Sequence, residues 1–265
     1  MKWVRLFVIS LLGMVLLIGC GSEKHPENVI AVVNGKYITV EDVERELMVR
    51  ELFIEIYDAL NQIYEIDDQR EALLEGFGLK EGELTPEQER YFEDLERSTT
   101  KKLTENEAFN ILLREEVLYQ EAVRFSHDVT EDWVKEVFAE SDEINREVIE
   151  SDEESKEFYN KYVEVSTEIY NKYGFASEED YFSQRVDRLV YNMATNKLQF
   201  QFENAMADKI TDSHFWQIEL ANAWGNYSEY LIDKAKVKIL KPEFSFEKYG
   251  QPWNYGDLDL KSLGV

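Results

Sequence analysis

Apolar residues follow two different spacings along this chain, and the spacing separates two short extended segments from long helices. Residues 29–33 are an unbroken run of apolar, mostly β-branched residues, and residues 235–240 alternate apolar and basic residues until Pro242. Both patterns are typical of strands. From residue 40 to residue 234 the apolar positions are mostly three or four apart, which predicts amphipathic helices. Because a lone strand leaves its backbone groups unpaired, we expect residues 29–33 and 235–240 to pair. The fold is then mainly α-helical, with a small β-ribbon made from its N- and C-terminal segments.

The first strand leads through a tight turn into the first helix. Asn34 and Gly35 suit the two positive-φ positions of a reversal between strands. Thr39 is placed to cap the following helix, and Asp42 stands where a capping box carries Glu. This helix is expected to run to about Tyr64. Its predicted apolar stripe consists of Val43, Leu47, Phe53, Ile56, Leu60, Ile63 and Tyr64.

Capping motifs mark the later helix starts, and we assign these to Thr85, Thr104, Thr130, Ser151, Ser177 and Thr211. The helix after Thr104 is expected to be central in the core, because it carries Phe109, Leu112, Leu113, Val117, Leu118 and Val123. Gly174 and Gly225 are predicted helix ends, with a further short helix over residues 227–234.

The helix that Ser177 caps is predicted to continue to Ile210 and has apolar residues on more than one face. Such a helix either lies centrally in a bundle or leaves one face for a partner. Its Met and aromatic side chains suit an adaptable apolar surface. The candidate peptide-binding residues on this helix are Met193, Phe200, Phe202 and Met206, with simple core packing as the alternative for each.

The N-terminus has the features of a bacterial lipoprotein signal peptide. Lys2 and Arg5 precede an apolar stretch of about 13 residues, which is short for a membrane span. The stretch ends in Leu17, Ile18, Gly19 and Cys20, which resembles a lipobox with Cys20 as the lipid attachment site. The alternative is a plain signal anchor with an incidental cysteine. Since Cys20 is the sole cysteine, the mature chain is expected to fold without disulfides.

These features divide the chain into a signal peptide (1–19), a polar tether (20–28), a helical domain (29–241) with a helical insertion at about 67–103, and an aromatic tail (242–265). The tail contains Phe244, Phe246, Tyr249, Trp253 and Tyr255, so we expect it to lie along the helical body or on a partner.

The charge excludes some partners. The chain has 29 basic and 55 acidic residues, a net charge of −26. Cleavage before Cys20 removes Lys2 and Arg5 and leaves −28. Such a surface repels phosphate backbones, which argues against nucleic-acid binding, and it also argues against attachment to a bilayer by charge. The lipid alone is expected to hold the protein on the extracytoplasmic face of the membrane.

No sequence motif of an enzyme is present. We find no nucleophile elbow, zinc-protease motif, dinucleotide-binding loop or calcium loop, and the glycines near Gly76 lack the strand and spacing of a phosphate loop. His25, His127 and His214 are scattered. Acidic pairs such as those at 67–68 and 152–153 are expected to be solvated helix ends. We therefore assign no catalytic residue, no metal site and no cofactor.

Three segments together resemble the N-terminal chaperone domain of the SurA/PrsA family of extracytoplasmic folding factors. Residues 32–43 read Val-Val-Asn-Gly-Lys-Tyr-Ile-Thr-Val-Glu-Asp-Val. Residues 112–122 read Leu-Leu-Arg-Glu-Glu-Val-Leu-Tyr-Gln-Glu-Ala and are followed by Val-Thr-Glu-Asp at 129–132. The closing segment, 234–239, reads Lys-Ala-Lys-Val-Lys-Ile. The three occur in the family's order.

The resemblance implies a cradle of helices that binds unfolded client segments. Many members of the family also carry a parvulin-type prolyl isomerase module, but no run of strands and glycine turns occurs between Phe109 and Lys234. The resemblance therefore implies chaperone-like binding of unfolded or partner polypeptides without isomerisation. The alternative is a structural or adaptor lipoprotein of the cell envelope that binds one specific protein.

Overall fold

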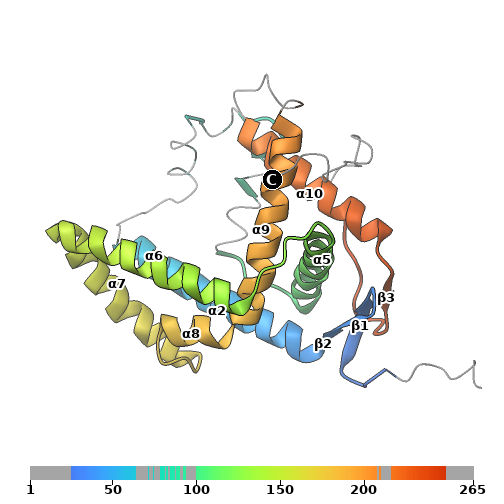
Figure 1. Cartoon of the computed structure of the whole chain (residues 1–265), viewed down its shortest axis with the longest axis horizontal. Helices are drawn as coiled ribbons and strands as arrows, with labels where there is room; N and C mark the ends of the chain where they lie inside the picture. Colours follow the sequence, from blue (N-terminus) through green and yellow to red (C-terminus); the bar gives the residue numbers. More distant parts are fainter. Residues whose placement is uncertain are drawn as a thin grey trace, which may run out of the picture.

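The computed structural model describes residues 25–63, 100–207, 209 and 216–248, together with isolated positions between 71 and 93. These residues form long helices and one small sheet (Figure 1). The elements in chain order are β1 (Val29–Val33), β2 (Lys36–Thr39), α2 (Val40–Ile63), α5 (Glu105–Arg124), α6 (Glu131–Ser151), α7 (Glu153–Lys172), α8 (Glu178–Gln184), α9 (Val186–Ala207), α10 (Trp216–Lys234) and β3 (Val237–Ile239). The prediction of a mainly helical chain with a small β-ribbon is confirmed.

The sheet joins the two ends of the described chain, as predicted. Its strand order is β2-β1-β3, and both neighbours of β1 are antiparallel to it. In the long-range pair, Ala31 is opposite Ile239 and Val33 is opposite Val237. Asn34 and Gly35 have φ angles of 49° and 93° in the turn between β1 and β2. These positive angles explain why the reversal contains Asn and Gly.

The start of α2 follows the predicted capping box. The Asp42 carboxylate accepts hydrogen bonds from the Thr39 amide (2.9 Å) and hydroxyl (2.8 Å), and the Asp42 amide donates to the Thr39 hydroxyl (3.3 Å). The predicted apolar stripe is partly wrong, because Phe53 is 44% exposed while Val49 and Leu52 are buried. The reason is that α2 packs on α5 near its start and on α7 further along, so its buried face changes along the helix.

Two apolar clusters hold the helices together. The main core surrounds α5, which packs against α2, α9, α10 and the sheet. This confirms α5 as the central helix, although Val123 is exposed. The main core includes Ile30, Val33, Phe109, Leu113, Leu198, Phe202, Met206, Tyr227 and Leu231. The second cluster joins α2, α7 and α8 through Val49, Leu52, Ile56, Tyr170, Phe175 and Tyr181.

Most predicted helix caps are confirmed. Thr85 and Gln88 form a capping box, as do Thr104 and Glu107, and Thr130 caps α6. The assignment of Ser151 is wrong by one position, because α6 includes Ser151 and the side chain of Asp152 accepts the Ser155 amide (2.8 Å). Both residue types cap well, so the sequence alone did not separate them.

The predicted single helix from Ser177 to Ile210 is in fact two helices. Ser177 caps α8, which ends at Gln184, and α9 begins at Val186. At Arg185, between them, the backbone N–H bonds to Phe182 O, three residues back, and the buried side chain lies over the Tyr181 ring at 5.5 Å. The break lets α8 pack in the second cluster while α9 enters the main core.

The predicted helix end at Gly225 is also wrong. Helix α10 runs unbroken from Trp216 to Lys234, and Gly225 does not have a positive φ. Burial of the neighbouring Ala223 and Tyr227 in the main core outweighs the helix-breaking tendency of one glycine, which is about 1 kcal/mol. By contrast, Gly174 after α7 has a φ of 89° and ends that helix as predicted.

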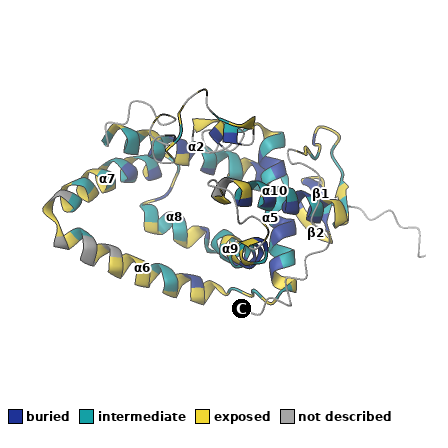
Figure 2. Cartoon of the chain, turned by 90° about the horizontal axis from the view of Figure 1, so that it is seen from above, coloured by how far each residue is buried: buried dark blue, intermediate teal, exposed yellow. Residues whose placement is uncertain are grey.

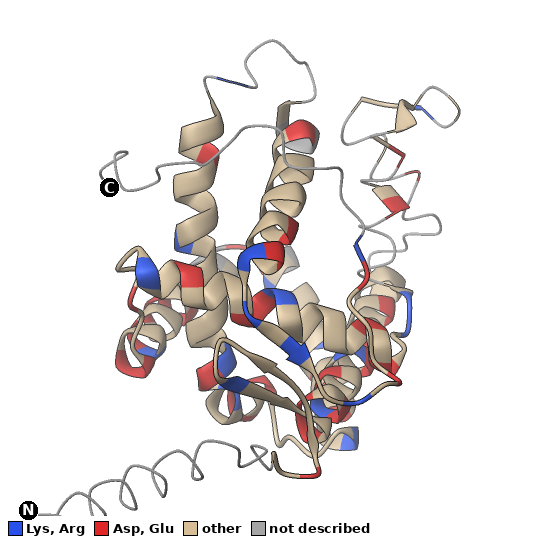
Figure 3. Ribbon diagram, turned by 90° about the vertical axis from the view of Figure 1, so that its right-hand side faces the viewer, with Lys and Arg blue, Asp and Glu red and all other residues tan. Residues whose placement is uncertain are grey.

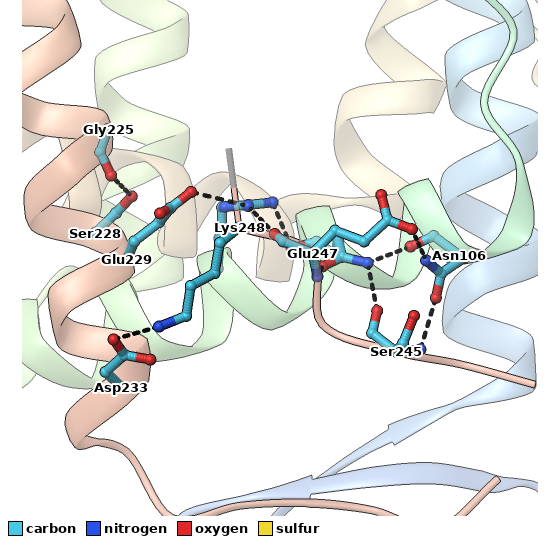
Figure 4. Close-up of polar contacts among 10 residues, drawn as sticks. Asn106, Gly225, Ser228, Glu229, Asp233, Ser245, Glu247 and Lys248 are labelled. Atoms are coloured by element: carbon cyan, nitrogen blue, oxygen red, sulfur yellow. Dashed lines mark hydrogen bonds and ion pairs between the residues drawn. The ribbon is translucent and has the colours of Figure 1, made fainter. Parts of the chain in front are cut away.

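Residues 243–248, which we call the tail segment (Glu243–Lys248), lie across α5 and α10 (Figure 4). Phe244 is buried in the main core against Phe109, with ring centroids 5.4 Å apart. The prediction that the aromatic tail lies along the helical body is confirmed for this segment. Tyr249, Trp253 and Tyr255 lie outside the described residues.

Several other predictions also fall outside the described residues. These are the signal peptide with Leu17, Ile18, Gly19 and Cys20, the helix start at Thr211 and most of the 67–103 insertion. Among the residues that the structure describes, no helix combines the length and the apolarity that a membrane crossing requires.

Candidate functional site

Helix α9 has two apolar faces, and the structure buries only one of them. Val190, Ala194, Leu198, Phe202 and Met206, spaced by four, form its buried face. Met193 and Phe200 lie on a different face, which looks toward the start of α6. The prediction that this helix has more than one apolar face is confirmed.

The second face lines an open groove of about 540 Å³, which lies within the roughly 300–1,000 Å³ range of binding pockets. We call it the α6/α9 groove, and its lining residues are His127, Trp133, Met193, Asn196, Lys197, Phe200 and Gln201. Helix α6 is largely exposed beside α9 (Figure 2). The two aromatic rings in the groove remain accessible, Phe200 by 57% and Trp133 by 37%.

Local contacts hold the aromatic side of the groove in place. Thr130 caps α6 by accepting the Trp133 amide (3.2 Å), and the next residue, Val134, is buried. Trp133 therefore sits in the first turn of a capped and anchored helix. The Lys197 ammonium lies 4.2 Å from the centre of the Trp133 ring, a cation–π contact between α9 and α6.

The polar side of the groove is formed by a histidine and an amide. His127, in the loop before α6, has its Nε2 2.7 Å from Oε1 of Gln201 on α9. Since an amide oxygen accepts, His127 donates from Nε2 in this arrangement. Asn196 adds a second side-chain amide to the lining. Asn196 is exposed and can bond the backbone groups of an extended polypeptide, whereas Gln201 is buried and bonded to His127.

The four residues assigned from sequence separate into two pairs. Met193 and Phe200 line the groove, whereas Phe202 and Met206 have no exposed surface and belong to the main core. For Phe202 and Met206 the alternative of core packing is therefore correct. The sequence prediction missed Trp133, His127 and Lys197, because they lie on other segments or are polar. A signal was present for Trp133, a large aromatic residue directly after a helix cap.

The groove differs in charge from the rest of the chain. Acidic residues are spread over the helices (Figure 3), but the described residues that line the groove include Lys197 and no carboxylate. The residues that line the groove therefore do not repel a bound apolar segment by negative charge.

Tyrosines with raised pKa values lie in or against the second cluster, among them Tyr162, Tyr170 and Tyr181. The Tyr162 hydroxyl donates to Oε1 of Glu178 (3.2 Å). Burial raises the pKa of Glu178, while burial and the nearby Glu178 raise the pKa of Tyr162 to about 12. This pair contributes to packing between α7 and α8. In the part of the chain that is described, no group of three or more His, Cys, Asp or Glu side chains is placed to bind a metal ion.

Comparison with known proteins adds no relative, since no protein-family model, no curated protein and no solved structure matches this chain.

Proposed function

We propose that this chain is a lipid-anchored extracytoplasmic protein that binds extended apolar segments of other polypeptides in the α6/α9 groove. The proposal includes a helical domain like that of the SurA/PrsA family and a lipid on Cys20. The observation that carries it is the second apolar face of α9, on which Met193 is half-buried and Phe200 is 57% exposed, whereas the residues of the first face are buried. Exposed apolar surface next to polar groups is typical of interaction sites.

The side chains of the groove suit bound segments of varied amino-acid sequence. Trp133, Met193 and Phe200 supply apolar surface that adapts to different side chains. The exposed amide of Asn196 offers hydrogen bonds that any peptide backbone can use. Because the contacts depend little on ligand sequence, the groove fits many unfolded chains.

The mechanism is reversible holding. A secreted chain cannot aggregate through an apolar stretch while that stretch occupies the groove. The concentration of free, aggregation-prone chain therefore falls as the bound fraction rises. The high negative charge of the protein keeps the complex soluble by repulsion between complexes. No covalent step is involved.

The test measures whether the full chain suppresses aggregation of several unrelated denatured proteins. We expect the wild type to suppress it and the double variant Trp133→Ser/Phe200→Ser to lose most of this activity. The matched control is Trp216→Ser, which removes a half-exposed tryptophan outside the groove and is expected to leave the activity unchanged. Absence of suppression by the wild type would refute holding, and tight binding to a single envelope protein would then support the adaptor alternative.

Two further measurements test the remaining parts of the proposal. Mass analysis of the protein from cell membranes is expected to find an acyl group on Cys20 as the new N-terminus, and an unmodified Cys20 would refute the anchor. A proline-isomerisation assay is expected to give the uncatalysed rate. Measurable catalysis would contradict the assignment of binding without isomerisation.

A further inference from the structure

The tail segment is held mainly through its backbone, by side chains of one face of α5. Asn110 donates from Nδ2 to Ser245 O (2.9 Å) and accepts the Glu247 amide at Oδ1 (2.9 Å). One turn earlier, Asn106 accepts the Ser245 amide at 2.8 Å. One turn later, the Arg114 guanidinium donates to Glu247 O at 2.9 Å. Side chains at i, i+4 and i+8 of α5 thus bind both backbone groups of Ser245 and both backbone groups of Glu247, two residues further along the extended chain.

Only two side chains of the segment add apolar contacts. Phe244 is buried against Phe109, and Phe246 is half-buried with the Arg114 guanidinium 5.4 Å from its ring centre. The residues between and beside them, Glu243, Ser245 and Glu247, are exposed. The segment therefore alternates inward apolar and outward polar positions, like a strand on the edge of a sheet.

Asn110 is the most informative residue of this surface. Its side chain is 1% exposed on the central core helix, where an apolar residue would ordinarily be expected. A buried amide is costly unless its hydrogen bonds are made. Apart from the Asn106 carbonyl at 2.7 Å, its partners are all backbone groups of the tail segment. Hydrogen bonds to the main chain of the tail segment offset the cost of burying this amide, and main-chain hydrogen bonds are also what provide affinity when proteins bind extended peptides.

We infer that Asn106, Phe109, Asn110 and Arg114, which we call the tail seat, form a second polypeptide-binding site occupied here by the chain's own tail segment. Its ligand class is an extended segment with two apolar, preferably aromatic, residues separated by one polar residue. Backbone hydrogen bonds provide affinity for any extended chain, and the two apolar positions provide selectivity. This inference does not depend on the α6/α9 groove, which is built from other residues.

The tail segment then acts as an internal competitor. A tethered segment has an effective concentration in the millimolar range, so it outcompetes a similar free peptide. The apparent affinity for an external segment equals the intrinsic affinity multiplied by the fraction of molecules in which the seat is open. A substitution that weakens the contact between the tail segment and the tail seat, without altering the seat itself, must therefore increase binding of an external peptide.

The experiment uses the full chain and a fluorescent peptide with the sequence of residues 243–248, followed by fluorescence anisotropy. The variant Phe244→Ser/Phe246→Ser is expected to bind the peptide at least about tenfold more tightly than the wild type. A control peptide with both phenylalanines replaced by serine is expected to bind neither. Adding Asn110→Ala to the variant is expected to reduce binding at least about tenfold, whereas Asn160→Ala, on the exposed face of α7, is expected to have no effect.

A second variant keeps the test decisive if the first variant does not fold. Lys248→Glu replaces the ion pair with Asp233 (2.5 Å) by two like charges at the surface and leaves the core intact. It is expected to increase peptide binding and to speed hydrogen exchange at the Ser245 and Glu247 amides. If neither folded variant binds the peptide more tightly than the wild type, or if the control peptide binds equally well, the tail seat is only an internal contact. The α6/α9 groove is also proposed to bind apolar segments, so each comparison is repeated in the Trp133→Ser/Phe200→Ser background. The same ratios are expected there, which separates this test from that of the groove.

Discussion

Replacement of Gly225 by alanine is expected to stabilise the protein. Gly225 lies inside α10 without a positive φ, and a Cβ atom added there meets nothing within 4 Å. The Ser228 hydroxyl donates to the Gly225 carbonyl (2.7 Å), a contact that alanine retains. Alanine restricts the unfolded chain and favours the helix, so the free energy of unfolding should rise by about 0.5–1 kcal/mol.

The matched control is Gly174→Ala. Gly174 also has free space where a Cβ atom would lie, but its φ is +89°. A non-glycine residue in this left-handed region costs about 1–2 kcal/mol, so the same substitution should destabilise the protein. The two substitutions are therefore expected to change the free energy of unfolding in opposite directions. The cause is the φ angle at each position and not a difference in packing.

Urea denaturation at 25 °C, followed by circular dichroism, measures both effects. For a chain of this size each kcal/mol corresponds to about 2–4 °C in Tm, so thermal unfolding gives an independent check. The reasoning is refuted if Gly225→Ala lowers stability or if Gly174→Ala raises it. The first result would mean that α10 does end near Gly225, as the sequence pattern predicted.

Three further predictions follow from burial and charge. Phe202→Ala should lower the free energy of unfolding by about 3–5 kcal/mol, since Phe202 is fully buried, whereas Phe200→Ala should change it by less than about 0.5 kcal/mol; equal losses in urea denaturation would contradict the assignment of the two faces of α9. Burial raises the pKa of Glu178, so the folded state binds its proton more tightly than the unfolded state, and this contribution to stability is lost as pH rises from below 4.5 through the folded pKa. Urea denaturation across that range should show the wild type losing stability relative to Glu178→Gln, and parallel curves would contradict this. Hydrogen bonds from Lys172 and Tyr173 lower the pKa of Glu55, so its contribution is present above about pH 4.5 and lost as pH falls through the folded pKa. Because the Glu55–Lys172 pair is solvated, a double-mutant cycle at neutral pH should give only about 0.2–1 kcal/mol, and a larger coupling that persists at acid pH would contradict this account.

The sequence predicted the features that depend on local chemistry. The Asn34-Gly35 turn, the capping boxes at Thr39 and Thr104, and the Gly174 helix end were all readable because each depends on residues within one turn of the chain. The pairing of β1 with β3 was also predictable, because these are the clear strand patterns at either end of a helical stretch. For each of these two strands the other was therefore the obvious long-range partner.

The errors occurred where packing over long distances decides the structure. The break at Arg185 depends on Tyr181 and Phe182 belonging to one cluster and α9 to another, which no local signal shows. For the same reason the pattern did not separate Phe200 from Phe202. The apolar spacing identified two faces on that helix, but only the position of α5 determines which face is buried.

Both proposed binding surfaces are built on helices of the main core. Phe200 and Met193 project from α9, and Asn106, Asn110 and Arg114 from α5, and these two helices pack against each other. A site on packed helices is held in its binding geometry before the ligand arrives, so the protein loses little conformational entropy on binding. The extended ligand bears most of the ordering cost, which keeps affinity for any one flexible segment modest. Modest affinity for many segments is the property that reversible holding requires, and it follows here from placing apolar groups and groups that bind backbone on packed helices of the main core.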